Sequence, residues 1–216
     1  MKESEEKEKK YKIVMLGDQN VGKTSIINRF KHNKFVGNIE PTLALDFQSK
    51  EIFIDNINVK LLLYDTAEQE KFRTLIPLYT REANIIFFIY DITNSDSFHN
   101  IEKWYNSLEN VNKNEAIFFL VGNKIDLNDE RKVPEEEARA YANRYNFIFQ
   151  EVSALTGDGI EELFLNQLAQ EIKNYLLFDK KQVREQEEEI KKLNLQDINE
   201  KNKKNKSNKK CCCCAK

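Results

Sequence analysis

The segment GDQNVGKT, residues 17–24, has the residue types and spacing of a phosphate-binding loop. Gly17 and Gly22 permit a tight path in which backbone N–H groups point inward at phosphate oxygens. Lys23 would neutralise phosphate charge, and Thr24 would place a hydroxyl on Mg²⁺. The segment lies between an apolar run and a helical pattern, which favours this interpretation over a plain glycine-containing turn.

Two further segments have the chemistry to hold a base. Asp126, in NKID (123–126), can accept from both the ring N–H and the amino group of guanine, a match that adenine lacks. Asn123 and Lys124 are expected to tie this segment to the phosphate loop and to pack on the base. Backbone N–H groups of VSAL (152–155) can donate to the guanine carbonyl oxygen. Taken alone, a tetrapeptide such as NKID is usually a polar strand exit.

These segments need strands and helices to bring them together. Apolar runs predict strands, and between them lie helical patterns. The alternation predicts an α/β fold with three layers: a six-stranded, mostly parallel sheet with one antiparallel edge strand and helices on both faces. An unrelated α+β fold is the alternative. The expected strands are 11–17, 45–54, 59–65, 84–91, 116–123 and 147–154, with a turn DNIN in a hairpin after 54, and the expected helices are 23–30, about 95–110, 134–146 and 159–177.

Composition limits the classes of protein to consider. A chain of 216 residues with 40% hydrophobic content and 14 Phe is long enough for one domain with a real core. The net charge of −2 gives no sign of a nucleic-acid partner. No apolar run is long enough to span a membrane, and the charged start MKESEEKEKK does not resemble a secretory signal. All four cysteines fall at 211–214, which excludes a disulfide framework and favours a cytosolic protein.

Three regions differ in composition. Residues 1–10 form a charged arm that we expect to be disordered, and 11–178 form the globular domain. Residues 179–216 form a polar, Lys-rich tail that either continues the last helix for a few turns or is coil, with disorder expected from about residue 196.

In this order, the phosphate loop, Asp65 at the end of an apolar run, NKID and VSAL resemble the Ras superfamily of small GTPases over residues 11–178. The stretches LALDF, YDTAEQEKF, YTREA and FIYDIT resemble its Rab branch, and Gln19 with LIPLY looks most like the Golgi-associated Rab subgroup. The resemblance implies a P-loop NTPase fold (a G domain) that binds GTP or GDP with Mg²⁺. It also implies a GTP-hydrolysing switch in vesicle traffic, and Gln19 and Glu68, where the chain departs from the family, predict that this hydrolysis is slow.

The resemblance also implies roles for individual residues. Lys23 and Gln69 would be catalytic, with Gln69 orienting the attacking water, and Phe35 would stack on guanine. Thr24, Thr42 and Asp65 would hold Mg²⁺, and Phe47, Tyr64 and Tyr79 would form an effector surface. The residues implied to bind nucleotide are Asp18, Gln19, Asn20, Val21, Gly22, Lys23, Thr24, Ser25, Phe35, Thr42, Glu68, Asn123, Lys124, Asp126, Ser153, Ala154 and Leu155.

Glu68 departs most from the family pattern, because relatives have glycine at this position. A backbone that needs positive φ would cost about 1–2 kcal/mol with glutamate. Repulsion between its carboxylate and phosphate would reach about 3 kcal/mol. Gln19, Asn20, Ile39, Tyr64 and Leu155 are lesser departures. A GTP-binding scaffold with negligible hydrolysis is therefore the alternative function, while an ATP-using P-loop enzyme conflicts with Asp126.

The C-terminal sequence KKCCCCAK predicts lipidation. Read as C-a-a-X it modifies Cys213, and read as a Rab-type ending it modifies both Cys213 and Cys214. Two lipids with the Lys-rich approach can hold a protein on an anionic membrane. Palmitoylation of Cys211 or Cys212 stays open, and metal binding lacks zinc-finger spacing. The family implies a monomer on the cytosolic face of a Golgi or endosomal membrane, with an exchange factor, an activating protein, a GDP-dissociation inhibitor and effectors as partners.

Overall fold

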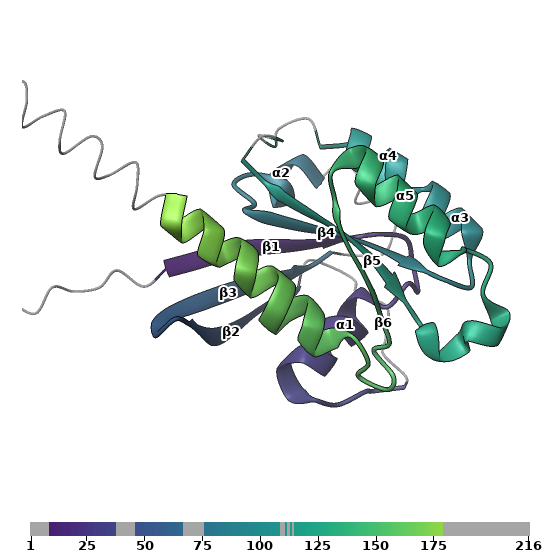
Figure 1. Ribbon diagram of the computed structural model, residues 1–216, viewed down its shortest axis with the longest axis horizontal. Coiled ribbons are helices and arrows are strands. Elements are labelled where there is room, and N and C mark those ends of the chain that lie inside the picture. Colours follow the sequence, from purple (N-terminus) through teal and green to yellow (C-terminus); the bar gives the residue numbers. More distant parts are fainter. Residues whose placement is uncertain are drawn as a thin grey trace, which may run out of the picture. The chain divides into compact units, whose positions relative to one another are not determined.

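The computed structural model describes residues 9–37, 46–66, 76–108, 111, 113 and 115–178. The chain divides into two compact units, Met1–Ala169 and Gln170–Lys216. The described part of the second unit, 170–178, is helical. In chain order the elements (Figure 1) are β1 (Lys9–Leu16), α1 (Lys23–His32), β2 (Asp46–Ile54), β3 (Ile57–Asp65), α2 (Ile76–Thr80), β4 (Ile85–Asp91), α3 (Ser95–His99), α4 (Ile101–Asn106), β5 (Ile117–Asn123), a 3₁₀ helix (Ile125–Glu130), α5 (Glu135–Tyr145), β6 (Ile148–Val152) and a π-helical segment (Glu162–Gln167).

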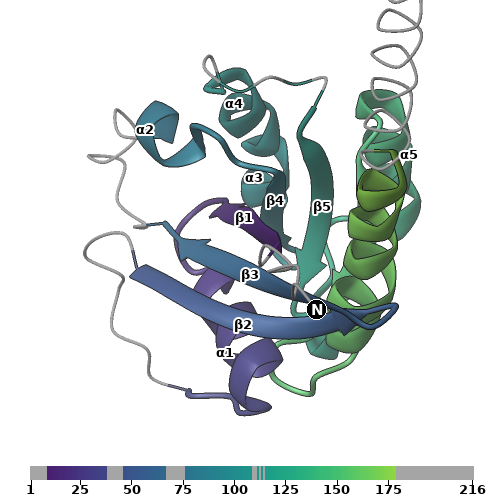
Figure 2. The same ribbon diagram turned by 90° about the vertical axis from the view of Figure 1, so that its left-hand side faces the viewer.

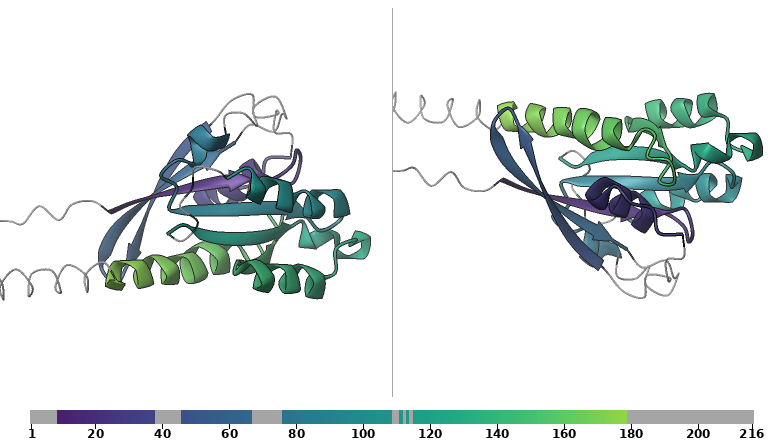
Figure 3. Two further views of the ribbon diagram at one scale, coloured as in Figure 1. Left: turned by 90° about the horizontal axis from the view of Figure 1, so that it is seen from above. Right: turned by 90° about the horizontal axis from the view of Figure 1, so that it is seen from below.

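The sheet of the first unit has six strands in the order β2-β3-β1-β4-β5-β6. Only β2 pairs antiparallel, with β3, and it lies at the edge of the sheet (Figure 2). Seen from above and below, the β2–β3 hairpin runs at an angle to the other strands, as sheet twist requires (Figure 3). The predicted sheet is confirmed. Because β1, β3, β4, β5 and β6 are parallel, their carboxyl ends lie along the same side of the sheet. Ligands of parallel α/β sheets bind at this side.

Helices pack against both faces of the sheet. Alternate residues of β4 point to opposite faces, so Phe88 joins a core cluster with residues of α2, α3, α4 and α5. On the other face, Phe87 contacts Phe164 with ring centroids 5.5 Å apart, and Phe164 stacks on Phe30 of α1 at 3.9 Å. All of β4 is buried, which explains its continuous apolar sequence.

Three predicted boundaries are wrong. The hairpin turn contains Asp55 and Asn56 alone, whose φ values of 48° and 66° suit a two-residue turn of type I′. The helix expected at about 95–110 is two shorter helices that meet at Asn100, and Asn94 caps the first through bonds from the Asp96 and Ser97 amides. β1 starts at Lys9, inside the predicted arm, because Val59 of β3 pairs with it.

No helix within the described ranges is both long and apolar enough to cross a membrane.

Candidate nucleotide-binding site

The phosphate loop connects β1 to α1, and two close approaches fix its path. A Cβ at Gly17 would lie 2.2 Å from the Ile89 carbonyl oxygen, and one at Gly22 would lie 2.3 Å from the Asn123 amide nitrogen. Asn20 has a φ of 63°, in the left-handed region that Asn tolerates better than most residues. The departure from small residues at Asn20 is therefore compatible with the backbone of this loop.

Lys23 lies beneath the loop and is 1% exposed. Its ammonium donates to the carbonyl oxygens of Gly17, at 3.0 Å, and Asp18, at 2.8 Å. A buried cation at the start of a helix is well placed to neutralise a phosphate group.

Thr24 and Asp65 are brought together although they come from different elements. Thr24 Oγ1 donates to Asp65 Oδ2 at 2.5 Å, and Asp65 is 1% exposed at the end of β3. Mg²⁺ binds oxygen ligands, usually through one or two carboxylates together with phosphates and water. A hydroxyl and a carboxylate beside the phosphate loop therefore fit Mg²⁺. Among the residues that the structure describes, no cluster of three or more His, Cys, Asp or Glu offers another metal site.

Asn123 joins three segments of the site, namely its own loop, the phosphate loop and the loop that contains Ala154. Its amide nitrogen donates to the Val21 carbonyl at 2.8 Å, and its side-chain oxygen accepts from the Ala154 N–H at 3.1 Å. The side chain is buried, so both bonds are protected from water. The prediction that Asn123 ties its loop to the phosphate loop is confirmed.

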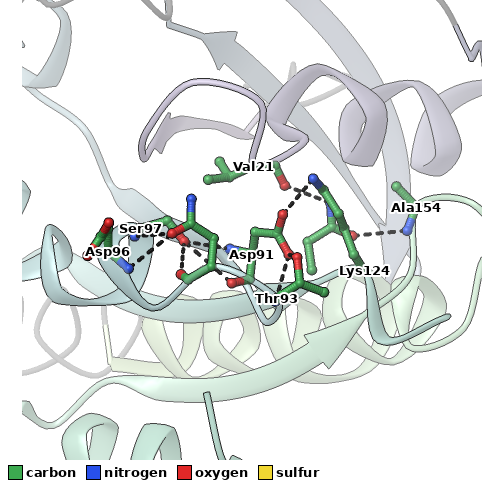
Figure 4. Close-up of polar contacts among 9 residues, drawn as sticks. Val21, Asp91, Thr93, Asp96, Ser97, Lys124 and Ala154 are labelled. Carbon is green, nitrogen blue, oxygen red and sulfur yellow. Dashed lines mark hydrogen bonds and ion pairs between the residues drawn. The ribbon is translucent and has the colours of Figure 1, made fainter. Parts of the chain in front are cut away.

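Lys124 was expected to make the same link but instead pairs with Asp91. Its ammonium lies 2.6 Å from Asp91 Oδ2 (Figure 4). The other carboxylate oxygen of Asp91 accepts from the backbone N–H and the hydroxyl of Thr93, both at 2.8 Å. Asp91 ends β4 and is 7% exposed. A buried carboxylate without a partner is strongly destabilising, so the pairing with Lys124 stabilises this site. Asp91 lies within the stretch FIYDIT, but the resemblance assigned no role to its side chain.

Asp126 is held by Ser153, whose hydroxyl donates to Asp126 Oδ1 at 2.5 Å. Nearby, Arg131 and Glu151 form a bidentate ion pair, in which Arg131 Nη1 donates to Glu151 Oε1 at 2.7 Å and Nη2 donates to Oε2 at 2.8 Å. The hydrogen bond to Glu151 raises the pKa of Arg131, and burial raises the pKa of the nearby Tyr90 hydroxyl. The pair connects the chain that follows NKID to the strand that precedes Ser153, so it braces both predicted base-binding segments.

A cavity of about 400 Å³ opens above these groups, within the usual range for small-molecule sites. Three of the lining residues, Val36, Gly37 and Leu127, belong to no sequence motif and were not predicted as site residues. The lining residues are Asn20, Gly22, Thr24, Ser25, Phe35, Val36, Gly37, Asn123, Lys124, Asp126, Leu127, Ala154 and Leu155.

Other predicted site residues lie beside the cavity or outside the described residues. The Asp18 carboxylate turns away and accepts from Asn100 at 2.6 Å and from the Trp104 indole at 2.8 Å, which leaves only its backbone for phosphate. Gln19 is exposed, while Val21, Lys23 and Ser153 are buried beneath the lining. Ile39, Thr42, Glu68 and Gln69 lie outside the described residues.

The sequence model of the Ras family matches residues 12–174. The chain belongs to the Ras family of small GTPases. Members of this family bind GTP and GDP, typically with Mg²⁺, and act as hydrolases and switches with regulators and effectors. In this Ras-family chain, residues of the phosphate loop, of NKID and of VSAL line one cavity, and these are residues predicted to hold Mg²⁺ and the nucleotide.

The three aromatic residues predicted to contact effectors lie on β2, β3 and α2. Phe47 is half-exposed, and its ring centroid is 5.1 Å from that of Tyr64. The Lys12 ammonium lies 4.9 Å from the centre of the Tyr64 ring, which is close enough for a cation–π contact. Tyr79 is partly buried in α2. Phe47 is exposed and Tyr64 is partly buried beneath it, and aromatic residues at the surface suit a protein-contact surface.

Proposed function

We propose that this Ras-family GTPase is a Rab-type switch that cycles on and off a membrane during vesicle-mediated transport. The run YDTAEQEKF (64–72), which begins with the last two residues of β3 and matches the Rab pattern, is the observation that carries the proposal. The exposed Phe47, which packs on the partly buried Tyr64 of the adjoining strand, supports a partner surface in the same region. We further propose the cytosolic face of a Golgi or endosomal membrane as its location.

Four groups of this chain would hold the nucleotide. Lys23 neutralises β and γ phosphate charge, Thr24 and Asp65 supply oxygen ligands to Mg²⁺, and Asp126 accepts from the guanine edge. Bound Mg²⁺ would stabilise charge on the phosphates during hydrolysis. We propose that Thr42 completes the set of Mg²⁺ ligands and that Gln69 orients the attacking water.

Slow intrinsic hydrolysis is part of the proposal. Gln19 is an exposed, long side chain in the phosphate loop, and Glu68 adds a carboxylate beside Gln69 in sequence. Displacing the attacking water by about 1 Å can slow a reaction on the order of a hundredfold. An activating protein would then be needed to switch the molecule off. An exchange factor, a GDP-dissociation inhibitor and effectors are the other partners that we propose.

A scaffold that binds GTP without hydrolysing it is the second candidate, and Glu68 favours it. Retention of Thr24, Thr42 and Gln69 favours the switch, because a scaffold needs no groups that align water.

Replacing Glu68 with glycine distinguishes the two candidates. Because glycine restores loop freedom and removes a charge, we expect GTP hydrolysis to become about 5- to 30-fold faster, the equivalent of 1–2 kcal/mol. Single-turnover hydrolysis at saturating Mg²⁺ measures this rate, with Glu82→Gly on an exposed turn as the matched control. An unchanged rate would show that Glu68 does not limit hydrolysis, and undetectable turnover in both proteins would favour the scaffold.

Replacing both Cys213 and Cys214 with serine tests the membrane anchor. Because one lipid gives only marginal anchoring, loss of both sites should move the protein from the membrane fraction to the soluble fraction of cells. Nucleotide affinity of the purified variant should not change. The matched control replaces Cys211 and Cys212. If the Cys213/Cys214 variant stays on membranes while the control is released, the anchor is upstream of the predicted pair.

A further inference from the structure

Arg29 reaches from α1 to the loop that contains Ala154 and Leu155. Its Nε donates to the Ala154 carbonyl at 2.9 Å, and its Nη2 donates to the Leu155 carbonyl at 2.5 Å. Its Nη1 donates to the Asn33 carbonyl at 3.0 Å, at the end of α1. One guanidinium therefore fixes two consecutive carbonyls of this loop and is itself anchored to its own helix.

The direction of these carbonyls determines where the loop's N–H groups point. In a trans peptide the C=O and N–H point in opposite directions, and the chain has no cis peptide among its described residues. The Ala154 carbonyl faces Arg29, so the N–H of Leu155 faces away from it. Both Ala154 and Leu155 line the cavity.

Most of the other N–H groups of this loop are already used. The Ser153 N–H donates to the Asp158 carbonyl at 2.9 Å, the Ala154 N–H to Asn123 at 3.1 Å, and the Thr156 N–H to the Ser153 hydroxyl at 3.0 Å. The Leu155 N–H and the Ala154 carbonyl belong to the same peptide group. Because Arg29 donates to that carbonyl, the direction of the Leu155 N–H is fixed. The donor pattern of the loop is therefore rigid before any base arrives.

We propose that Arg29 is a positioning residue for base recognition, which holds loop 153–155 with the Leu155 N–H directed at the carbonyl oxygen of guanine. The inference rests on the guanine specificity expected from Asp126. An arginine suits this role because its planar fork can serve several carbonyls at once, whereas a lysine ammonium lacks the fork. Arg29 shares α1 with Lys23 and Thr24, so one helix positions both the phosphate and the base ends of the nucleotide.

The test compares the dissociation rates of three nucleotides from full-length protein in Mg²⁺ buffer. The first is GDP, and the second is 6-thio-GDP, in which sulfur, a weaker acceptor, replaces the carbonyl oxygen. The third is IDP, which lacks the amino group but keeps that oxygen. Arg29→Ala should release GDP and IDP about tenfold faster, as expected for a misaligned hydrogen bond. It should change the release of 6-thio-GDP much less.

Two variants serve as comparisons. Arg29→Lys keeps the charge and should give an intermediate increase for GDP, and it replaces Arg29→Ala if the alanine variant fails to fold. Arg81→Ala removes an exposed arginine and should leave all three rates unchanged.

Equal acceleration of all three nucleotides by Arg29→Ala would overturn the proposal, because it would show general loosening of the site. Equal release of GDP and 6-thio-GDP by the unmodified protein would also overturn it, since the loop would then not contact the oxygen. Failure of the underlying guanine specificity would appear separately, as equal binding of ADP and GDP by the unmodified protein.

Discussion

Lys23→Met is expected to weaken the binding of GDP and GTP about a thousandfold. The Lys23 ammonium is 1% exposed and lies beneath the phosphate loop, where it would face the β and γ phosphates. Two unit charges at about 4 Å with an effective dielectric near 20 interact by about 4 kcal/mol, which corresponds to this factor. Methionine keeps the buried stem and removes only the charge and the donors. Isothermal titration calorimetry with nucleotide-free protein in Mg²⁺ buffer measures the loss.

Lys34→Ala is the control, because it removes an exposed cation after α1 and should leave affinity within about twofold of the unmodified protein. Thermal unfolding of the nucleotide-free proteins separates a binding defect from a folding defect. Binding by Lys23→Met at near-normal affinity would show that the phosphates are not held by this loop.

Asp126→Asn should transfer the preference of the site from guanine to xanthine. Guanine presents two donors, the ring N–H and the amino group, which suit the two oxygens of a carboxylate. Asparagine presents one acceptor and one donor, which suit the ring N–H and the carbonyl that xanthine has in place of the amino group. We expect GDP affinity to fall about a hundredfold, or 2–3 kcal/mol, and affinity for xanthosine diphosphate to rise by a similar factor.

The control for this change is Asp129→Asn, on the same exposed 3₁₀ helix. Competition against a fluorescent guanine nucleotide reports both affinities. Unchanged GDP affinity in Asp126→Asn would place the base elsewhere. A loss of GDP affinity without a gain for xanthine would indicate that Ser153 no longer orients residue 126.

Local sequence was enough to predict the six-stranded sheet and the motifs that follow its strands. The run IIFFIY, which precedes Asp91 in β4, is apolar or aromatic at every position, as expected only of a strand covered on both faces. Gly17 and Gly22 mark the phosphate loop because their backbones approach Ile89 and Asn123 too closely for any side chain. Ten of the predicted nucleotide-binding residues line the cavity. Most of them belong to motifs at the carboxyl ends of β1, β5 and β6, which lie along the same side of the sheet.

The supporting contacts could not be predicted in this way, since each joins positions far apart in the chain. Arg29 lies 125 residues from Ala154, and Asp18 lies 86 residues from Trp104. Nothing in the neighbourhood of Lys124 indicates that its partner is Asp91, which comes from the preceding strand of the sheet. Such contacts depend on the packing of whole elements, and a motif shows only the residues nearest the ligand.

The central claim is that the cavity binds a guanine nucleotide through the phosphate loop and Asp126. The most direct test is displacement of a fluorescent GDP analogue from purified full-length protein by unlabelled GDP and by ADP, in Mg²⁺ buffer. We expect GDP to displace the analogue at least about a thousandfold better than ADP, because adenine would leave the Asp126 carboxylate and the Leu155 N–H without partners. Equal displacement by the two nucleotides would contradict it.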